Sequence, residues 1–156
     1  MPESTLTIAG LIAVVVLVAA NGLFVATEFA YVAVRRSRIE QLAAGGQSRA
    51  KLLLASLQDL DNYIAATQLG ITMSSLALGW VGEPALAHLI EPPVEAVVGG
   101  WASTTVSHTA AVAVAFTLIT TLHIVLGELA PKTLALQRSE ATALWVAAPI
   151  AVFNRV

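Results

Sequence analysis

Three long segments without Asp, Glu, Lys or Arg alternate with short charged segments along this chain. They run over residues 4–27, 62–82 and 106–127. Each is long enough for a helix to cross the hydrocarbon core of a bilayer, which takes about 20 residues. The pattern predicts an all-α integral membrane protein with transmembrane helices at about residues 5–34, 60–82 and 106–131. We assign the whole chain, 1–156, to a single transmembrane domain.

The segments outside these spans predict shorter helices. Residues 35–59 contain two amphipathic stretches separated by Gly45-Gly46, and they form a helical connection that we place on the cytosolic side. Residues 141–153 are apolar again but too short to span a bilayer comfortably. We therefore predict a membrane-surface helix over residues 139–156. The sequence stops there without a terminating signal, and we expect further cytosolic domains that are absent from this chain.

The second span is expected to end near an interface at Trp80 to Pro84, because Trp is favoured there. Residues 85–90 then suggest a short interfacial helix. Glu91-Pro92-Pro93 and Gly99-Gly100-Trp101 are typical loop sequences.

Composition and charge agree with a membrane location. The chain is 57% hydrophobic and only 12% charged, about half the charged fraction of a soluble domain. All eight Lys and Arg lie in residues 35–51 or 132–155, and the connection between spans two and three has none. The positive-inside rule then predicts the N-terminus outside and the C-terminus in the cytoplasm. A net charge of −2 provides no basic field for nucleic acid.

A carboxylate, Glu128, lies at the end of the third apolar segment. A charge inside a membrane segment is costly and by default marks a functional site. Pro131 has no N–H, so in an α-helix the carbonyl of Gly127 would lose its partner. A free carbonyl beside a carboxylate indicates a site for a hard cation. The alternative is a simple helix end, with Pro131 stopping the helix and Glu128 reaching interfacial water.

Each predicted span also carries one polar stripe at helical spacing. The stripes are Asn21 and Glu28, then Gln68, Thr72 and Ser75, then Thr117, Thr121 and Glu128. Polar stripes facing lipid are unfavourable, so we expect them to converge. They consist mostly of oxygen donors, the ligand type for Na⁺, Mg²⁺ and Ca²⁺. The alternative for any single Ser or Thr is a hydrogen bond to its own helix.

The sequence contains no motif of hydrolytic or phosphate-binding enzymes. His-Glu-x-x-His, Gly-x-Ser-x-Gly and phosphate-loop patterns are absent, and there is no cysteine. We therefore expect a protein that is not an enzyme.

Three separated motifs resemble one known family. Residues 21–30 (NGLFVATEFA), 68–72 (QLGIT) and 127–132 (GELAPK) are similar to the transmembrane domain of CNNM/CorC proteins, also called haemolysin-C-like. The resemblance covers nearly the whole chain, and the Gly-Glu-x-x-Pro-Lys element is its most specific part.

The resemblance implies a homodimeric Mg²⁺ transporter in the cell (inner) membrane, thought to export Mg²⁺ against Na⁺ influx. It implies three spans and a membrane-hugging helix, followed by a cytosolic CBS pair that binds ATP. The implied metal ligands are Asn21, Thr72, Gly127 and Glu128. Further cation contacts or gating positions are Thr27, Glu28, Gln68, Ser75 and Pro131. Glu28 would be a ligand for the coupling ion or a partner of a cytoplasmic Arg.

This sequence departs from the family pattern at two positions. Val25 stands where many relatives have Ser, and Thr72 replaces an amide. Mg²⁺ usually keeps several waters, which could replace the missing ligands. Two other functions fit the same residues: a cation-sensing membrane anchor for regulatory cytosolic domains, and a transporter of another cation, such as Na⁺.

Overall fold

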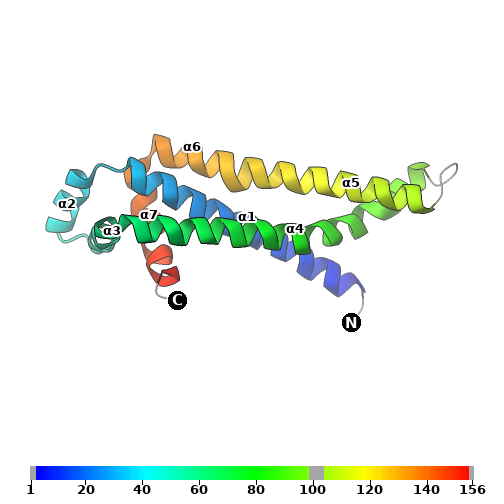
Figure 1. The fold of residues 1–156 in the computed structure, drawn as a ribbon, viewed down its shortest axis with the longest axis horizontal. Helices are drawn as coiled ribbons and strands as arrows, with labels where there is room; N and C mark the ends of the chain where they lie inside the picture. The colour runs from blue at the N-terminus through cyan, green and yellow to red at the C-terminus, as the bar shows by residue number, and fades with distance from the viewer. Residues whose placement is uncertain (1–2, 99–103, 155–156) are drawn as a thin grey trace.

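The structure is a computed structural model that describes residues 3–98 and 104–154, and these residues form helices only (Figure 1). The elements are α1 (Glu3–Ala33), α2 (Arg36–Ala44), α3 (Ser48–Gln58), α4 (Leu60–Val98), α5 (Thr104–Leu122), the π-helix η1 (His123–Leu129), α6 (Ala130–Gln137) and α7 (Ser139–Phe153). The predicted all-α class is confirmed.

Three long helical segments lie lengthwise, and the short helices gather at one end. Figure 1 shows α1, α4 and the continuous α5–η1–α6 segment along the molecule, with α2 and α3 at one end and α7 turned across the long helices there. Helix α1 is central, since it packs against α4, η1, α6 and α7. The segments apolar and long enough to cross a membrane are Thr7–Ala33, Leu60–Val97 and Thr105–Gln137. Three candidate spans agree with the prediction.

Helix α4 is longer than the predicted second span. It continues to Val98 through Pro84, Pro92 and Pro93, so the helix does not end at residue 82, and the loop predicted at residues 91–93 is wrong. Proline removes one N–H, but its fixed φ near −65° suits a helix, and α4 is long enough to keep its other hydrogen bonds. The predicted loop at Gly99-Gly100-Trp101 lies outside the described residues, as does the end of the predicted surface helix at residues 155–156.

The third helical segment also extends beyond its predicted end at residue 131. It remains helical to Gln137, with Pro131 in the first turn of α6. Because η1 precedes α6 without a break, the N–H that Pro131 lacks is the one that would bond the Gly127 carbonyl in a continuous α-helix.

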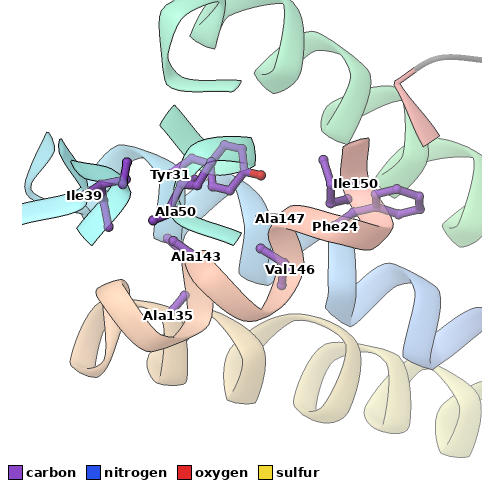
Figure 2. Close-up of a cluster of buried hydrophobic side chains, with 12 residues drawn as sticks. Phe24, Tyr31, Ile39, Ala50, Ala135, Ala143, Val146, Ala147 and Ile150 are labelled. Atoms are coloured by element: carbon purple, nitrogen blue, oxygen red, sulfur yellow. The ribbon is translucent and has the colours of Figure 1, made fainter. Parts of the chain in front are cut away.

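The largest hydrophobic core lies at the end of the molecule where α7 crosses α1 (Figure 2). Helix α7 buries Ala143, Val146, Ala147 and Ile150, which recur at the spacing of one helical face. This face packs against α1 and α3. Helix α7 is therefore an integral part of the core.

An ion-pair cluster holds the start of α7 to the connection between α1 and α2. The Glu140 carboxylate lies 3.0 Å from Arg35 Nη2 and 3.7 Å from Arg38 Nε. Such solvated pairs typically contribute about 0–1 kcal/mol each. The position of α7 therefore depends mainly on its packing against α1 and α3.

The long helices expose much of their apolar surface. Only 28%, 22% and 22% of the most apolar windows of the three candidate spans are buried within the chain. Large side chains such as Val15, Leu76 and Phe116 are exposed. A soluble protein rarely exposes apolar surface of this extent. Together with the length of the helices, this identifies a membrane protein whose long helices contact lipid.

Gly10→Ala is expected to destabilise the chain, because the added Cβ would lie 2.5 Å from the Cβ of Ala85. Neither atom can move unless a backbone shifts, so α1 and α4 would have to separate. Overpacking of this kind typically costs about 1–3 kcal/mol. Thermal unfolding in detergent, followed by tryptophan fluorescence, measures the loss. Gly79→Ala is the matched control, since its Cβ would meet nothing within 4 Å; equal losses in both variants would contradict the explanation.

Candidate cation site

Asn21 joins the three candidate spans near the middle of α1. Its side chain is only 2% exposed. The Nδ2 group donates a hydrogen bond to the carbonyl oxygen of Gly127 in η1, at 3.0 Å. The Oδ1 atom accepts hydrogen bonds from the hydroxyls of Ser74, at 3.1 Å, and Ser75, at 3.3 Å, both in α4. One buried amide thus connects α1, α4 and η1.

The polar network continues from Ser75 to His123. The Ser75 hydroxyl lies 3.2 Å from His123 Nε2. His123 is partly buried at the start of η1, four residues before Gly127. The network therefore contains one imidazole among amide, hydroxyl and carbonyl groups.

The backbone of η1 explains how Gly127 becomes available to Asn21. The N–H of Ala130 bonds the carbonyl of Val125, five residues earlier, as in a π-helix. Pro131 has no N–H for the Gly127 carbonyl, which accepts from Asn21 instead. The α-helical donor to this oxygen is absent because residue 131 is proline, but the oxygen is bonded to Asn21 rather than free. The prediction that Pro131 breaks the helix is wrong, because the π-helix passes directly into α6.

Gly127 also allows the close approach of its neighbours. A Cβ at this position would lie 3.0 Å from His123 Cδ2 and 3.1 Å from Asn21 Nδ2. These separations are tighter than ordinary van der Waals contact, so any side chain here would displace Asn21 or His123. The absence of a Cβ at Gly127 therefore lets both side chains occupy these positions.

Several predicted polar positions lie outside this network. The hydroxyls of Thr72, Thr117 and Thr121 are on exposed residues and donate to carbonyls four residues earlier in their own helices. Thr27 is buried and donates to Leu23 in the same way. These four hydroxyls follow the alternative considered from the sequence, a hydrogen bond within their own helix. The polar stripes therefore do not converge at Thr72, Thr117 or Thr121.

The two predicted acidic residues occupy different places. Glu128 follows Gly127 and is exposed on the surface of the chain. Glu28, seven residues after Asn21 on α1, accepts a hydrogen bond from Gln68 Nε2 at 3.4 Å. It does not pair with an arginine in the described part of the chain, where Arg35 and Arg38 pair with Glu140.

The donors available for a cation are mostly neutral. Within residues 3–98 and 104–154, no three His, Cys, Asp or Glu side chains form a group that could hold a metal ion. Ser74 Oγ and Ser75 Oγ lie 3.1 and 3.3 Å from Asn21 Oδ1, and adjacent ligands of an octahedral ion with bonds of about 2.0–2.1 Å lie about 3 Å apart. The Gly127 oxygen lies 3.0 Å from Asn21 Nδ2, which is not a cation ligand. The donor types suit a small hard cation, with Glu128 as the nearest carboxylate in sequence.

Two members of this network were not predicted as site residues. Ser74 is buried on the α4 face that also contains Gly70 and Leu78, at intervals of four residues. The small residues on that face were a signal for close helix packing. His123 precedes Gly127 by four residues, which places both on one helical face.

Comparison with known proteins relates nearly the whole chain to one protein family. The family model for the CNNM family, described as the cyclin M transmembrane N-terminal domain, matches residues 11–156. Three similar proteins come from Bacillus subtilis (strain 168). UPF0053 protein YhdT is 49% identical over 143 residues, covering 92% of this chain and 30% of that protein. UPF0053 protein YugS is 42% identical over 94% of this chain and 33% of its own length, and UPF0053 protein YrkA is 42% identical over 97% and 34%.

This chain spans about a third of the length of these relatives. The family model covers nearly all of the chain, including every element of the polar network. The chain therefore belongs to the CNNM family and contains its transmembrane N-terminal domain.

Proposed function

We propose that this domain transports Mg²⁺ across the membrane through the site around Asn21, Gly127 and Glu128. The observation that carries the proposal is the buried junction between Asn21 and the Gly127 carbonyl. It brings neutral oxygens from three membrane helices together, and Glu128, the residue after Gly127, would supply the charge that a hard cation requires. Membership of the CNNM family, which is consistent with divalent cation transport, supports it.

In this proposal each residue has a distinct role. Glu128 supplies negative charge, and Gly127 supplies a carbonyl that Pro131 leaves without its α-helical donor. Asn21 must turn its amide so that Oδ1, rather than Nδ2, faces the ion. The serine hydroxyls then give up their bonds to Asn21 and provide further oxygens. Val25 is buried on the same helix but has no donor atom, so waters complete the shell. Thr72 would become a ligand of the ion only if α4 rotated about its own axis.

The wider proposal concerns direction, coupling and assembly. We infer export of Mg²⁺ coupled to Na⁺ influx, in a homodimer in the cell membrane, with ATP bound only by cytosolic CBS-type domains elsewhere in the full-length protein. The distribution of Lys and Arg supports a cytoplasmic C-terminus. No chemical reaction is part of this function. Mg²⁺ flux in proteoliposomes tests it against a cation-sensing anchor, which would bind the ion without transport.

Glu128→Gln is expected to weaken Mg²⁺ binding by about tenfold or more while preserving the fold, because it keeps the shape and removes the charge. Calorimetric titration of the purified protein with Mg²⁺, at several Na⁺ concentrations, measures the change. Glu95→Gln is the matched control, since it removes the same charge from an exposed position far along α4. Equal Mg²⁺ affinity in wild type and Glu128→Gln would refute the assignment of Glu128 to the Mg²⁺ site.

Pro131→Ala is also expected to weaken Mg²⁺ binding. The new N–H can bond the Gly127 carbonyl, which then no longer faces Asn21 or an ion. The same titration measures the loss, and Pro84→Ala, inside α4, is the control for removing a helical proline. If Pro131→Ala binds Mg²⁺ as wild type does, the role assigned to the free carbonyl is wrong.

A further inference from the structure

His123 differs from the other histidines of the chain in its surroundings. His108 Nδ1 lies 2.9 Å from the Glu91 carboxylate, and both His108 and His88 are exposed near the far ends of α4 and α5. His123 is partly buried, and its Nε2 faces the hydroxyl of Ser75. That hydroxyl in turn faces Asn21 Oδ1. The imidazole is thus one hydroxyl away from the central amide of the cation site.

His123 Nε2 lies close enough to Ser75 for His123, Ser75 and Asn21 to be ligands of the same cation. Nε2 lies 3.2 Å from Ser75 Oγ, and Ser75 Oγ lies 3.3 Å from Asn21 Oδ1. Neighbouring ligands on an octahedral ion are separated by about 3 Å. A cation that takes the place of these hydrogen bonds could therefore contact the nitrogen and both oxygens. With its proton on Nδ1, the ring presents the Nε2 lone pair to such an ion.

A nitrogen ligand changes which cations the site prefers. Oxygen-only sites suit Mg²⁺, whereas imidazole favours first-row transition ions, whose affinities for mixed nitrogen and oxygen sites rise from Mn²⁺ to Co²⁺ and Ni²⁺. A site for Mg²⁺ alone has no need of an imidazole. The remaining network, Asn21, Ser74, Ser75 and Gly127, provides only oxygens.

We propose that His123 Nε2 is a direct ligand for divalent first-row transition ions such as Mn²⁺ and Co²⁺ in this same site, and that it sets the selectivity of the site between these ions and Mg²⁺. The proposal rests on the cation site proposed above and adds to it a nitrogen ligand that distinguishes between classes of divalent ion. If His123 were only a packing residue, its replacement would affect all cations alike. If His123 is a ligand, its replacement lowers the affinity for the transition ions much more than the affinity for Mg²⁺.

The first experiment compares Mn²⁺, Co²⁺ and Mg²⁺ binding to wild type and His123→Gln. Glutamine keeps a polar group that can hydrogen-bond Ser75 but lacks the imidazole. We expect Mn²⁺ and Co²⁺ affinities to fall by about tenfold or more, with little change for Mg²⁺. His108→Gln is the matched control, because it removes an exposed imidazole outside the network. Parallel losses for all three ions, or no loss for any, would overturn the proposal.

Pulsed electron paramagnetic resonance on the Mn²⁺-loaded protein provides a direct readout. Coordination by His123 predicts ¹⁴N modulation from imidazole in wild type and in His108→Gln, and its absence in His123→Gln. Bound Mn²⁺ that Mg²⁺ displaces but that shows no nitrogen coupling would refute His123 as a ligand and leave the oxygen site intact. Failure of wild type to bind any of the three ions would instead refute the cation site itself.

Discussion

The hydrogen bond between Asn21 Nδ2 and the Gly127 carbonyl is the interaction on which the arrangement of the long helices depends. In an apolar environment an unpaired carbonyl is costly, and Pro131 removes the donor that an α-helix would provide. The chain meets this requirement with a side chain from another helix. That solution requires Gly127 to lack a Cβ and Asn21 to be buried. The same groups that satisfy the backbone are therefore those that could bind a cation.

The two ends of the molecule are stabilised differently. At one end α7 buries a continuous apolar face against α1 and α3, as a helix does in a soluble protein. Along the long helices, the contacts are made by small residues, a few polar groups and a small apolar cluster of Val18, Leu78 and Ile119, and many large apolar side chains are exposed. Lipid on the outside provides no hydrophobic driving force between helices, so packing and hydrogen bonds must hold them together. A polar network can persist there because few other interactions compete with it.

Sequence patterns predicted three candidate spans and the short helices, and they singled out Asn21 and Gly127, which the structure brings into contact. Proline chemistry is local, so the sequence alone identified Gly127 as the carbonyl without an α-helical donor. They did not predict that α4 passes through Pro92 and Pro93, because the tolerance of a long helix for proline depends on its whole context. Helical phase at 100° per residue also favoured Thr72 over Ser74. Which face of α4 meets α1 is decided by close packing at Gly70, where an added Cβ would lie 2.7 Å from the Phe24 ring, and spacing alone does not reveal this.

Helix α1 connects the core at one end to the polar network. Ala30 and Tyr31 lie in the core that includes α7, and Asn21 lies further along the same uninterrupted helix. At a rise of about 1.5 Å per residue, the nine residues from Ala30 to Asn21 span about 14 Å. A helix of this length transmits displacement as a rigid body. Movement of α7 relative to the bilayer would therefore shift the amide of Asn21 relative to the serines of α4, which gives the chain a mechanical link between the core at its α7 end and the polar network.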